Sequence, residues 1–293
     1  MRESSNPVMR GVVRDNQTGY QQPGMNQGGY AGFGAGMAGA GAMANQYGQQ
    51  QPYPQQQAPV VGRQLTIDDV VTKTAITLVV LTLTAIASYF VVDSNNSLAM
   101  PLTLVGGLVG FALVMVASFG RKQDNPAIVL AYAAFEGLFV GAISFVFANM
   151  IVSNDTSAGA MISQAILGTF GVFFGMLIVY KVGAIRVTPR FTRMLLAGLV
   201  GVLVLMVGNL VIGIFNGGEG IGLRSGGPLA IVFSLVCIAL AAFSFLLDFD
   251  SADRLIRAGA PSKAAWGVAL GLTVTLVWLY VEILRLLSYF NSD

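Results

Sequence analysis

Five ionisable side chains lie inside apolar segments that are otherwise typical of membrane helices. Glu136 occurs in "AYAAFEGLFV", Asp248 and Asp250 end "FSFLLDFD", and Glu282 and Arg285 occur in "LYVEILRLL". Ionisable groups at membrane depth are costly unless they are paired or hydrated, so each is a functional candidate. Because carboxylate oxygens are ligands that hard cations such as calcium prefer, we expect acids of this set to bind or gate a cation.

The residue types that are absent restrict the chemistry further. The chain has no histidine and a single cysteine, Cys237. Ser-His-Asp triads, histidine metal sites and Cys/His nucleophile pairs are therefore excluded. A two-aspartate protease would need aspartates on separate helices, whereas Asp248 and Asp250 share one segment. We predict that the protein is not an enzyme and uses no cofactor.

The elements that position these side chains are predicted to be membrane helices. Of the 293 residues, 55% are hydrophobic and 10% are charged, whereas soluble domains carry about 25% charged residues. "LTIDD" reads as a helix start with Thr66 as a candidate N-cap. Seven apolar runs reach the length of about 20 residues that a membrane span needs. They lie at 71–92, 98–119, 126–150, 161–181, 193–215, 228–250 and 263–289. We predict an all-α polytopic membrane protein with a seven-helix bundle.

The basic residues of the loops predict the orientation of this bundle. They concentrate in the second, fourth and sixth loops, whereas the other loops carry only Arg224. By the positive-inside rule, the N-terminus is expected in the cytoplasm and the C-terminus outside. The basic residues on the predicted cytoplasmic side are Arg121, Lys122, Lys181, Arg186, Arg190, Arg193, Arg254, Arg257 and Lys263.

Residues 1–62 differ in composition from residues 63–293. They are rich in Gly, Gln, Ala and Tyr and show no apolar periodicity, so they are predicted to form a disordered cytoplasmic tail next to a transmembrane domain. The tail is a candidate contact for other membrane proteins. The net charge of +2 and the absence of a basic-aromatic patch argue against a nucleic-acid partner.

Depth along the helices predicts which acids share a site. Glu136 lies roughly 15 Å from the cytoplasmic end of its span at 1.5 Å per residue, and Asp248 and Asp250 lie near the cytoplasmic end of theirs. Acids that are buried together resist joint ionisation, which predicts a pH-sensitive cation site without histidine. Asp248 and Asp250 are about 200° apart on a helix, so both cannot face one pore. Which of the two faces the interior stays open.

Some of these charged residues and glycines also have a purely structural interpretation. Asp250 and Arg254 have the i,i+4 spacing of a solvated surface pair, whereas Asp248 has no such partner. Glu282 and Arg285 form an i,i+3 pair that is either structural or part of a gate. Glycine pairs at spacing four predict close helix contacts, and they are Gly106/Gly110, Gly137/Gly141, Gly171/Gly175 and Gly267/Gly271.

The order of motifs resembles the Bax inhibitor family, also called the transmembrane Bax inhibitor motif family, in its bacterial branch. The resemblance rests on "LTIDDVVTKT", "FEGLFVG", "LDFD" and "GAPSKAAWGVALGLTVTLVWLYVEILRLLSYF", over roughly residues 64–290. It implies a pH-sensitive calcium leak in a plasma membrane, here a bacterial inner membrane. It also implies an aspartate pair across spans six and seven, and the span-six member maps onto Asp250 or Asp248.

The span-seven aspartate of the family pattern is missing from this chain. About ten residues before Arg285 the sequence reads Thr273, Val274, Thr275. Glu136 matches the family's "EG" glutamate and is a candidate for the partner's role. The expected transient calcium ligands are thus Asp250, Asp248 and Glu136. The alternative function is a non-conducting interaction protein that modulates a membrane protease or a stress response.

Overall fold

The structure is a computed structural model that describes residues 63–151, 157–217 and 220–291. The tail predicted for residues 1–62 lies outside the described residues. The described part is all-helical apart from one isolated β-bridge, between Gln64 and Pro261. Seven of its helices are long and apolar enough to cross a membrane, as predicted: α2 (Ile67–Ser94), α3 (Ala99–Phe119), α4 (Pro126–Phe145), α5 (Ala158–Lys181), α6 (Pro189–Phe215), α7 (Pro228–Arg257) and α8 (Ala265–Phe290).

Local signals explain where several helices begin. Thr66 caps α2 through a capping box with Asp69, so the helix begins four residues before the predicted span and includes two acids in its first turn. This confirms the predicted N-cap. Asn125 caps α4 and Thr188 caps α6, each followed by a proline in the first turn, where the missing N–H of proline costs nothing.

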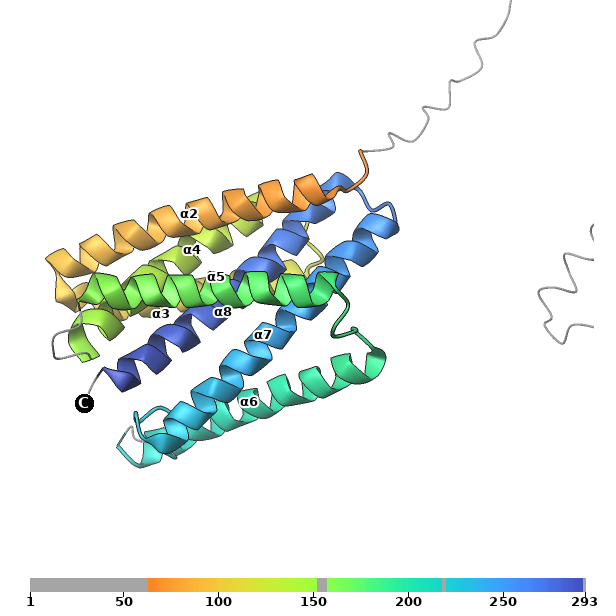
Figure 1. The fold of residues 1–293 in the computed structure, drawn as a ribbon. Helices are drawn as coiled ribbons and strands as arrows, with labels where there is room; N and C mark the ends of the chain where they lie inside the picture. Colours follow the sequence, from red (N-terminus) through yellow and green to blue (C-terminus); the bar gives the residue numbers. More distant parts are fainter. Residues whose placement is uncertain (1–62, 152–156, 218–219, 292–293) are drawn as a thin grey trace, which may run out of the picture. The chain divides into compact units, whose positions relative to one another are not determined.

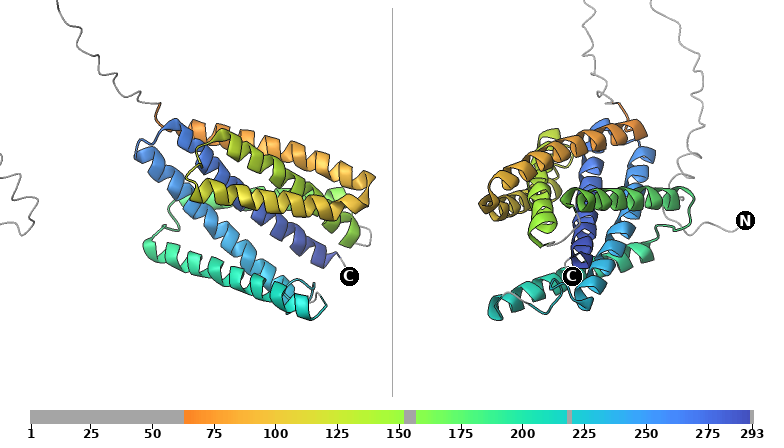
Figure 2. Two further views of the ribbon diagram at one scale, coloured as in Figure 1. Left: turned by 180° about the vertical axis from the view of Figure 1, so that it is seen from behind. Right: turned by 60° about the vertical axis from the view of Figure 1, so that its left-hand side comes forward.

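Helix α8 occupies the centre of the bundle (Figures 1 and 2). It contacts α2, α4, α5 and α7, and 67% of its most apolar stretch is buried. Its side chains contribute to two large clusters, one with α2, α4 and α5 and one with α5 and α7. Most side chains of α8 therefore contact other helices rather than lipid, although Phe290 at its end is exposed.

Glycines bring α2, α3 and α4 close together. A Cβ on Gly106 would lie 2.7 Å from the Phe135 carbonyl oxygen, and one on Gly141 would lie 2.7 Å from Ser88 Cβ. In contrast, Gly171 and Gly175 of α5 have nothing within 4 Å of such a Cβ. The pairs on α3 and α4 are therefore close helix contacts, and the pair on α5 is not one within the described residues. Gly267 and Gly271 of α8 lie against Gln123 and Asp248, at 3.2 and 3.6 Å from an added Cβ.

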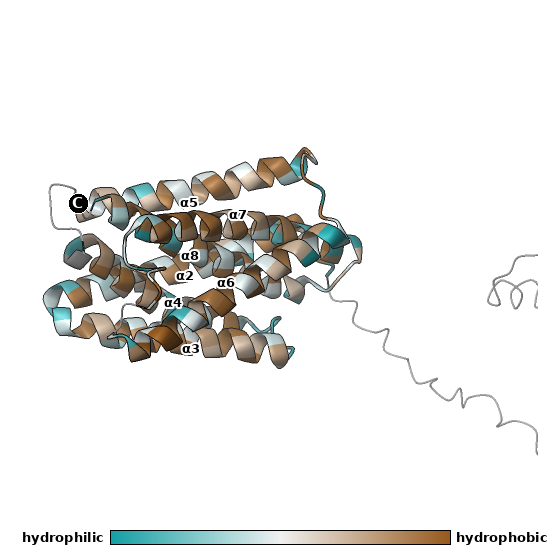
Figure 3. Cartoon of the chain, turned by 90° about the horizontal axis from the view of Figure 1, so that it is seen from below, coloured by the Kyte–Doolittle hydropathy of each residue, from teal (hydrophilic) through white to brown (hydrophobic). Residues whose placement is uncertain are grey.

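Helix α6 lies at the edge of the bundle, and only 6% of its most apolar stretch is buried. Its principal contacts are with α7. Figure 3 shows apolar residues along the lengths of the helices and hydrophilic ones mainly toward their ends and the loops. This distribution suits a protein whose outer surface is solvated by lipid tails.

Candidate cation site between helices α7 and α8

Asp248 and Thr275 meet where α7 packs against α8. The Thr275 hydroxyl lies 2.7 Å from Asp248 Oδ2 and donates a hydrogen bond to it. Asp248 Oδ1 lies beside Gly271, one turn earlier on α8, at 3.6 Å from the position a Cβ would take. This is an ordinary van der Waals distance, so Gly271 lies against the carboxylate, and the hydrogen bond from Thr275 fixes the orientation of the carboxylate.

A pocket of about 230 Å³ leads to this carboxylate from the end of the bundle where α7 ends and α8 begins. The exposed residues Gln123 and Ser251 lie at its rim, and Gly267 and Gly271 form part of its α8 wall. Asp124 also lines it, and its carboxylate lies 3.5 Å from Lys263 Nζ. Both partners of this pair are partly exposed, and exposed pairs contribute little to stability. The pocket therefore leads from solvent to the half-buried Asp248, past a partly exposed ion pair at its rim.

The neighbouring acids of α7 occupy a different setting. Asp250 is ion-paired with Arg254, and Asp253 lies 2.8 Å from Arg257, both at i,i+4 spacing. The arginines are about 70% and 80% exposed, so both pairs face the surface. Of the two aspartates that the sequence left open, Asp248 is the one that lines the pocket.

The carboxylate of Glu136 on α4 lies against α3. Its Oε2 abuts Gly110, where a Cβ would overlap it. Glu136 is half-buried, and no hydrogen bond or ion pair of its carboxylate occurs among the described residues. The described residues also contain no group of three or more acids, cysteines or histidines that could hold a metal ion. A direct role for Glu136 beside Asp248 stays a prediction.

Glu282 is clamped between two arginines toward the other end of α8. Its carboxylate accepts hydrogen bonds from Arg285 at 2.7 Å and from Arg224 at 3.1 to 3.3 Å. Arg224 comes from the loop between α6 and α7 and also lies 5.3 Å from the Phe233 ring centre. The predicted pair of Glu282 and Arg285 is therefore present, but it is part of a three-residue cluster with one surplus positive charge.

Four contributors were not assigned a role from the sequence. Thr275 was noted only as standing near the position of the missing aspartate, and Gln123 and Asp124 lie in a short polar loop. Arg224 did stand out in the sequence, because it is the sole basic residue in the loops at its end of the bundle. A partner for it on a helix was not predictable, because pairing across 58 residues depends on tertiary structure.

A bundle of seven long apolar helices defines a multi-pass membrane protein, and several of its carboxylates lie between the helices. A family model described as "Bax inhibitor 1 like" matches residues 6–292. The chain belongs to this family, whose members are generally non-enzymatic membrane proteins. This family match begins nearer the N-terminus than the resemblance inferred from the motifs, which covered roughly residues 64–290. No curated protein matches the chain.

Proposed function

We propose that the protein is a pH-sensitive passive cation leak, with calcium as the principal ion, and that Asp248 is its gating carboxylate. The observation that carries the proposal is the polar pocket between α7 and α8, which leads from solvent to Asp248 in a bundle that is otherwise mostly apolar. Carboxylate, hydroxyl and amide oxygens line it or bond to its acid, and calcium prefers such ligands. The family relationship supports the same function.

Protonation supplies the pH dependence in this proposal. An ionised Asp248 attracts a cation into the pocket, and a protonated one does not, so flux rises with pH. Beyond Asp248, buried side chains of α8 such as Leu272 and Leu276 close the bundle. Conduction therefore requires α7 and α8 to separate, and a charged Asp248 favours this separation because it gains hydration or a bound cation.

The proposed placement in the membrane follows the charge distribution of the loops. The pocket opens at the end of the bundle that carries Arg121, Lys122 and Lys263, which the positive-inside rule assigns to the cytoplasm. We propose a bacterial inner membrane, with the N-terminus in the cytoplasm. The cluster around Glu282 then lies in the outer half, where Glu282 and Arg285 hold the outer end of α8 closed.

The test is calcium flux into proteoliposomes from pH 6 to 8 for the parent and three single variants. Asp248→Asn should abolish the flux or flatten its pH dependence. Asp253→Asn is the matched control, because it removes a carboxylate from the same helix at a surface pair, and it should conduct like the parent. Asp250→Asn should also resemble the parent if its role is the surface pair with Arg254.

Two outcomes would contradict the proposal. If Asp250→Asn flattens the profile and Asp248→Asn does not, the gating group has been assigned to the wrong aspartate. If correctly folded parent protein gives no flux above empty liposomes, the protein is not a leak. The alternative of a non-conducting interaction protein would then be tested by deleting residues 1–60, the candidate contact segment.

A further inference from the structure

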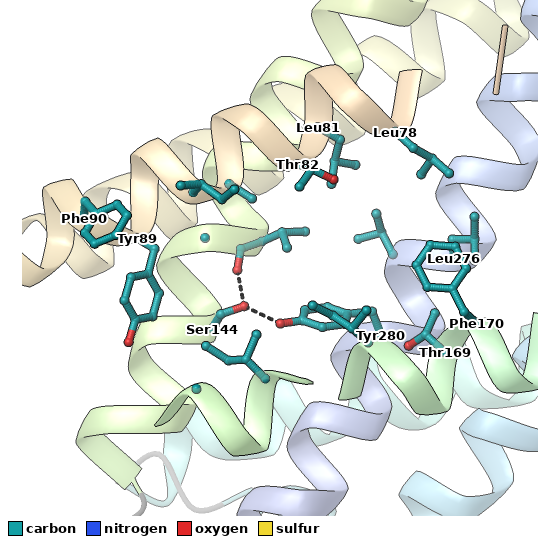
Figure 4. Close-up of a pocket in the computed structure, with 18 residues that line it drawn as sticks. Leu78, Leu81, Thr82, Tyr89, Phe90, Ser144, Thr169, Phe170, Leu276 and Tyr280 are labelled. Atoms are coloured by element: carbon teal, nitrogen blue, oxygen red, sulfur yellow. Dashed lines mark hydrogen bonds between the residues drawn. The ribbon is translucent and has the colours of Figure 1, made fainter. Parts of the chain in front are cut away.

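A second, apolar pocket of about 390 Å³ lies between α2, α4, α5 and α8 (Figure 4). Its rim is formed by exposed side chains of two helices, including Ile86 and Phe90 of α2 and Ile166 of α5. Its floor includes Leu276 and Val277 of α8, which are 4% and 6% exposed. The pocket therefore opens sideways, between α2 and α5, onto the surface that faces lipid.

The depth of the pocket matches one half of a bilayer. Its α5 wall extends from Gly159, next to the start of that helix, to Phe170. These eleven steps cover about 17 Å at 1.5 Å per residue. The hydrocarbon core of a bilayer is about 30 Å thick, so half of it is about 15 Å. A chain that enters beside Gly159 would reach Phe170 near the middle of the membrane.

The polar groups of the floor and of the α4 and α5 walls are engaged with the protein itself. Ser144 donates to the Val140 carbonyl at 2.6 Å and lies 2.8 Å from the Tyr280 hydroxyl, which in turn donates to it. Thr169 donates to the carbonyl of Ala165 at 2.7 Å. These hydroxyl hydrogens are not directed at a ligand, so the floor and the α5 wall offer mainly hydrocarbon surface. A polar solute would lose hydration there without recovering hydrogen bonds.

We propose that this pocket binds one acyl chain of a membrane phospholipid, which enters between α2 and α5 and lies against α8. If an apolar pocket of this size were empty, the side chains that line it would lose dispersion contacts. Lipid chains are the apolar molecules that are always present at its opening. Its volume lies within the range of about 300–1,000 Å³ typical of small-molecule sites. This assignment does not depend on the proposed ion leak.

The test is photolabelling in liposomes with a phosphatidylcholine that carries a diazirine near the end of one acyl chain, followed by mapping of the adducts. We expect adducts on Leu276 and Val277, which are too buried for lipids of the surrounding layer to reach except through the pocket. Ile166→Trp fills the opening and should abolish these adducts. Leu167→Trp is the matched control, because Leu167 is the next residue and 72% exposed, and it should retain them.

A second variant keeps the proposal testable if Ile166→Trp does not fold. Gly159→Leu narrows the pocket at its membrane-surface end, where an added Cβ meets nothing within 4 Å, and it should also abolish the adducts. Adducts confined to outward residues such as Leu167 would overturn the proposal, as would adducts on α8 that neither variant reduces. Labelling of α8 by a photoreactive free fatty acid but not by the phospholipid would overturn the assignment to a phospholipid.

Discussion

At the scale of single residues, Thr275 is the informative difference from the family pattern. It stands ten residues before Arg285, in the region where the resemblance places an aspartate, and it bonds directly to Asp248. Two carboxylates in contact must share a proton, whereas a hydroxyl donates to a carboxylate that is already ionised. The gate of this protein would therefore titrate as a single carboxylate rather than as a coupled pair.

Replacing Thr275 tests this interpretation. Thr275→Val removes the donor while keeping the shape, so the ionised Asp248 loses a hydrogen bond and the pH of half-maximal calcium flux should rise. Thr275→Ser keeps a hydroxyl and should preserve the profile. Thr273→Val is the control, because Thr273 bonds to the Ala269 carbonyl on its own helix. An unchanged profile in Thr275→Val would show that this hydrogen bond does not influence gating.

The sequence predicted the set of membrane-depth acids but not their roles. The spacing of Asp248 and Asp250 shows that they point in different directions, yet it does not show which direction is inward. The i,i+4 partner of Asp250 was the useful local signal, since it identified a surface pair that the structure contains. Thr275 could not be assigned, because its contact with Asp248 depends on how α7 and α8 are aligned.

At the scale of elements, the glycines of α4 determine how closely α2 can approach. A side chain at Gly141 would overlap the Ala85 carbonyl on α2 and come within 2.7 Å of Ser88 Cβ. Backbone on the opposing helix can yield only if the helices separate, which also disturbs the hydrogen bond from Ser88 to the Leu138 carbonyl.

We therefore expect Gly141→Ala to destabilise the protein by about 1–3 kcal/mol, the usual cost of overpacking. Gly175→Ala is the matched control on α5, where an added methyl group meets nothing within 4 Å. Thermal unfolding in detergent measures both variants. If Gly141→Ala unfolds at the same temperature as Gly175→Ala and the parent, α2 and α4 adapt to the extra methyl group without loss of stability.

The cluster around Glu282 fastens the loop between α6 and α7 to α8. Glu282→Gln would leave two arginines close together without a counter-charge, and removing one member of a buried pair costs about 3–5 kcal/mol. Arg224→Met should cost less, because it leaves Glu282 paired with Arg285. Denaturant unfolding compares the two variants. If Arg224→Met is as damaging as Glu282→Gln, the loop attachment rather than charge balance determines stability.

The helices themselves were largely predictable from apolar length. The predicted spans correspond to the seven long helices of the described residues, with differences at the ends. The sixth was expected at 228–250 but α7 continues to Arg257. Its last turns are amphipathic and carry the two surface ion pairs, so helix propensity and i,i+4 pairing extend it beyond the apolar run.

At the scale of the whole molecule, the predicted orientation can be tested by cysteine labelling. Cys237 is buried and is replaced by alanine to give a cysteine-free background. In intact cells, a membrane-impermeant maleimide should label Ser97→Cys, between α2 and α3. Lys122→Cys, between α3 and α4, should be labelled only after lysis, because basic loops stay in the cytoplasm. The reverse pattern would invert the membrane placement of both pockets.

The central position of α8 was not predicted, although its composition is consistent with it. The two spans of lowest mean hydropathy, α4 and α8, are also the two most buried. A helix shielded from lipid can carry polar residues such as Thr273, Thr275 and Glu282. The relation is not strict, since α5 is nearly as polar and faces outward, and hydropathy alone therefore cannot rank the helices by burial.

The peripheral helix α6 has a consequence for how the chain is threaded. It adds little to the core, yet it carries the chain back across the bilayer, so that α7 runs in the direction that places Asp248 beside Thr275. Deleting an even number of membrane spans would leave the orientation of the following helices unchanged. Deleting α6 alone would reverse the orientation of α7 and α8 in the membrane. Its indispensable property is therefore the crossing itself, and its lipid-facing side chains are free to vary as long as they remain apolar.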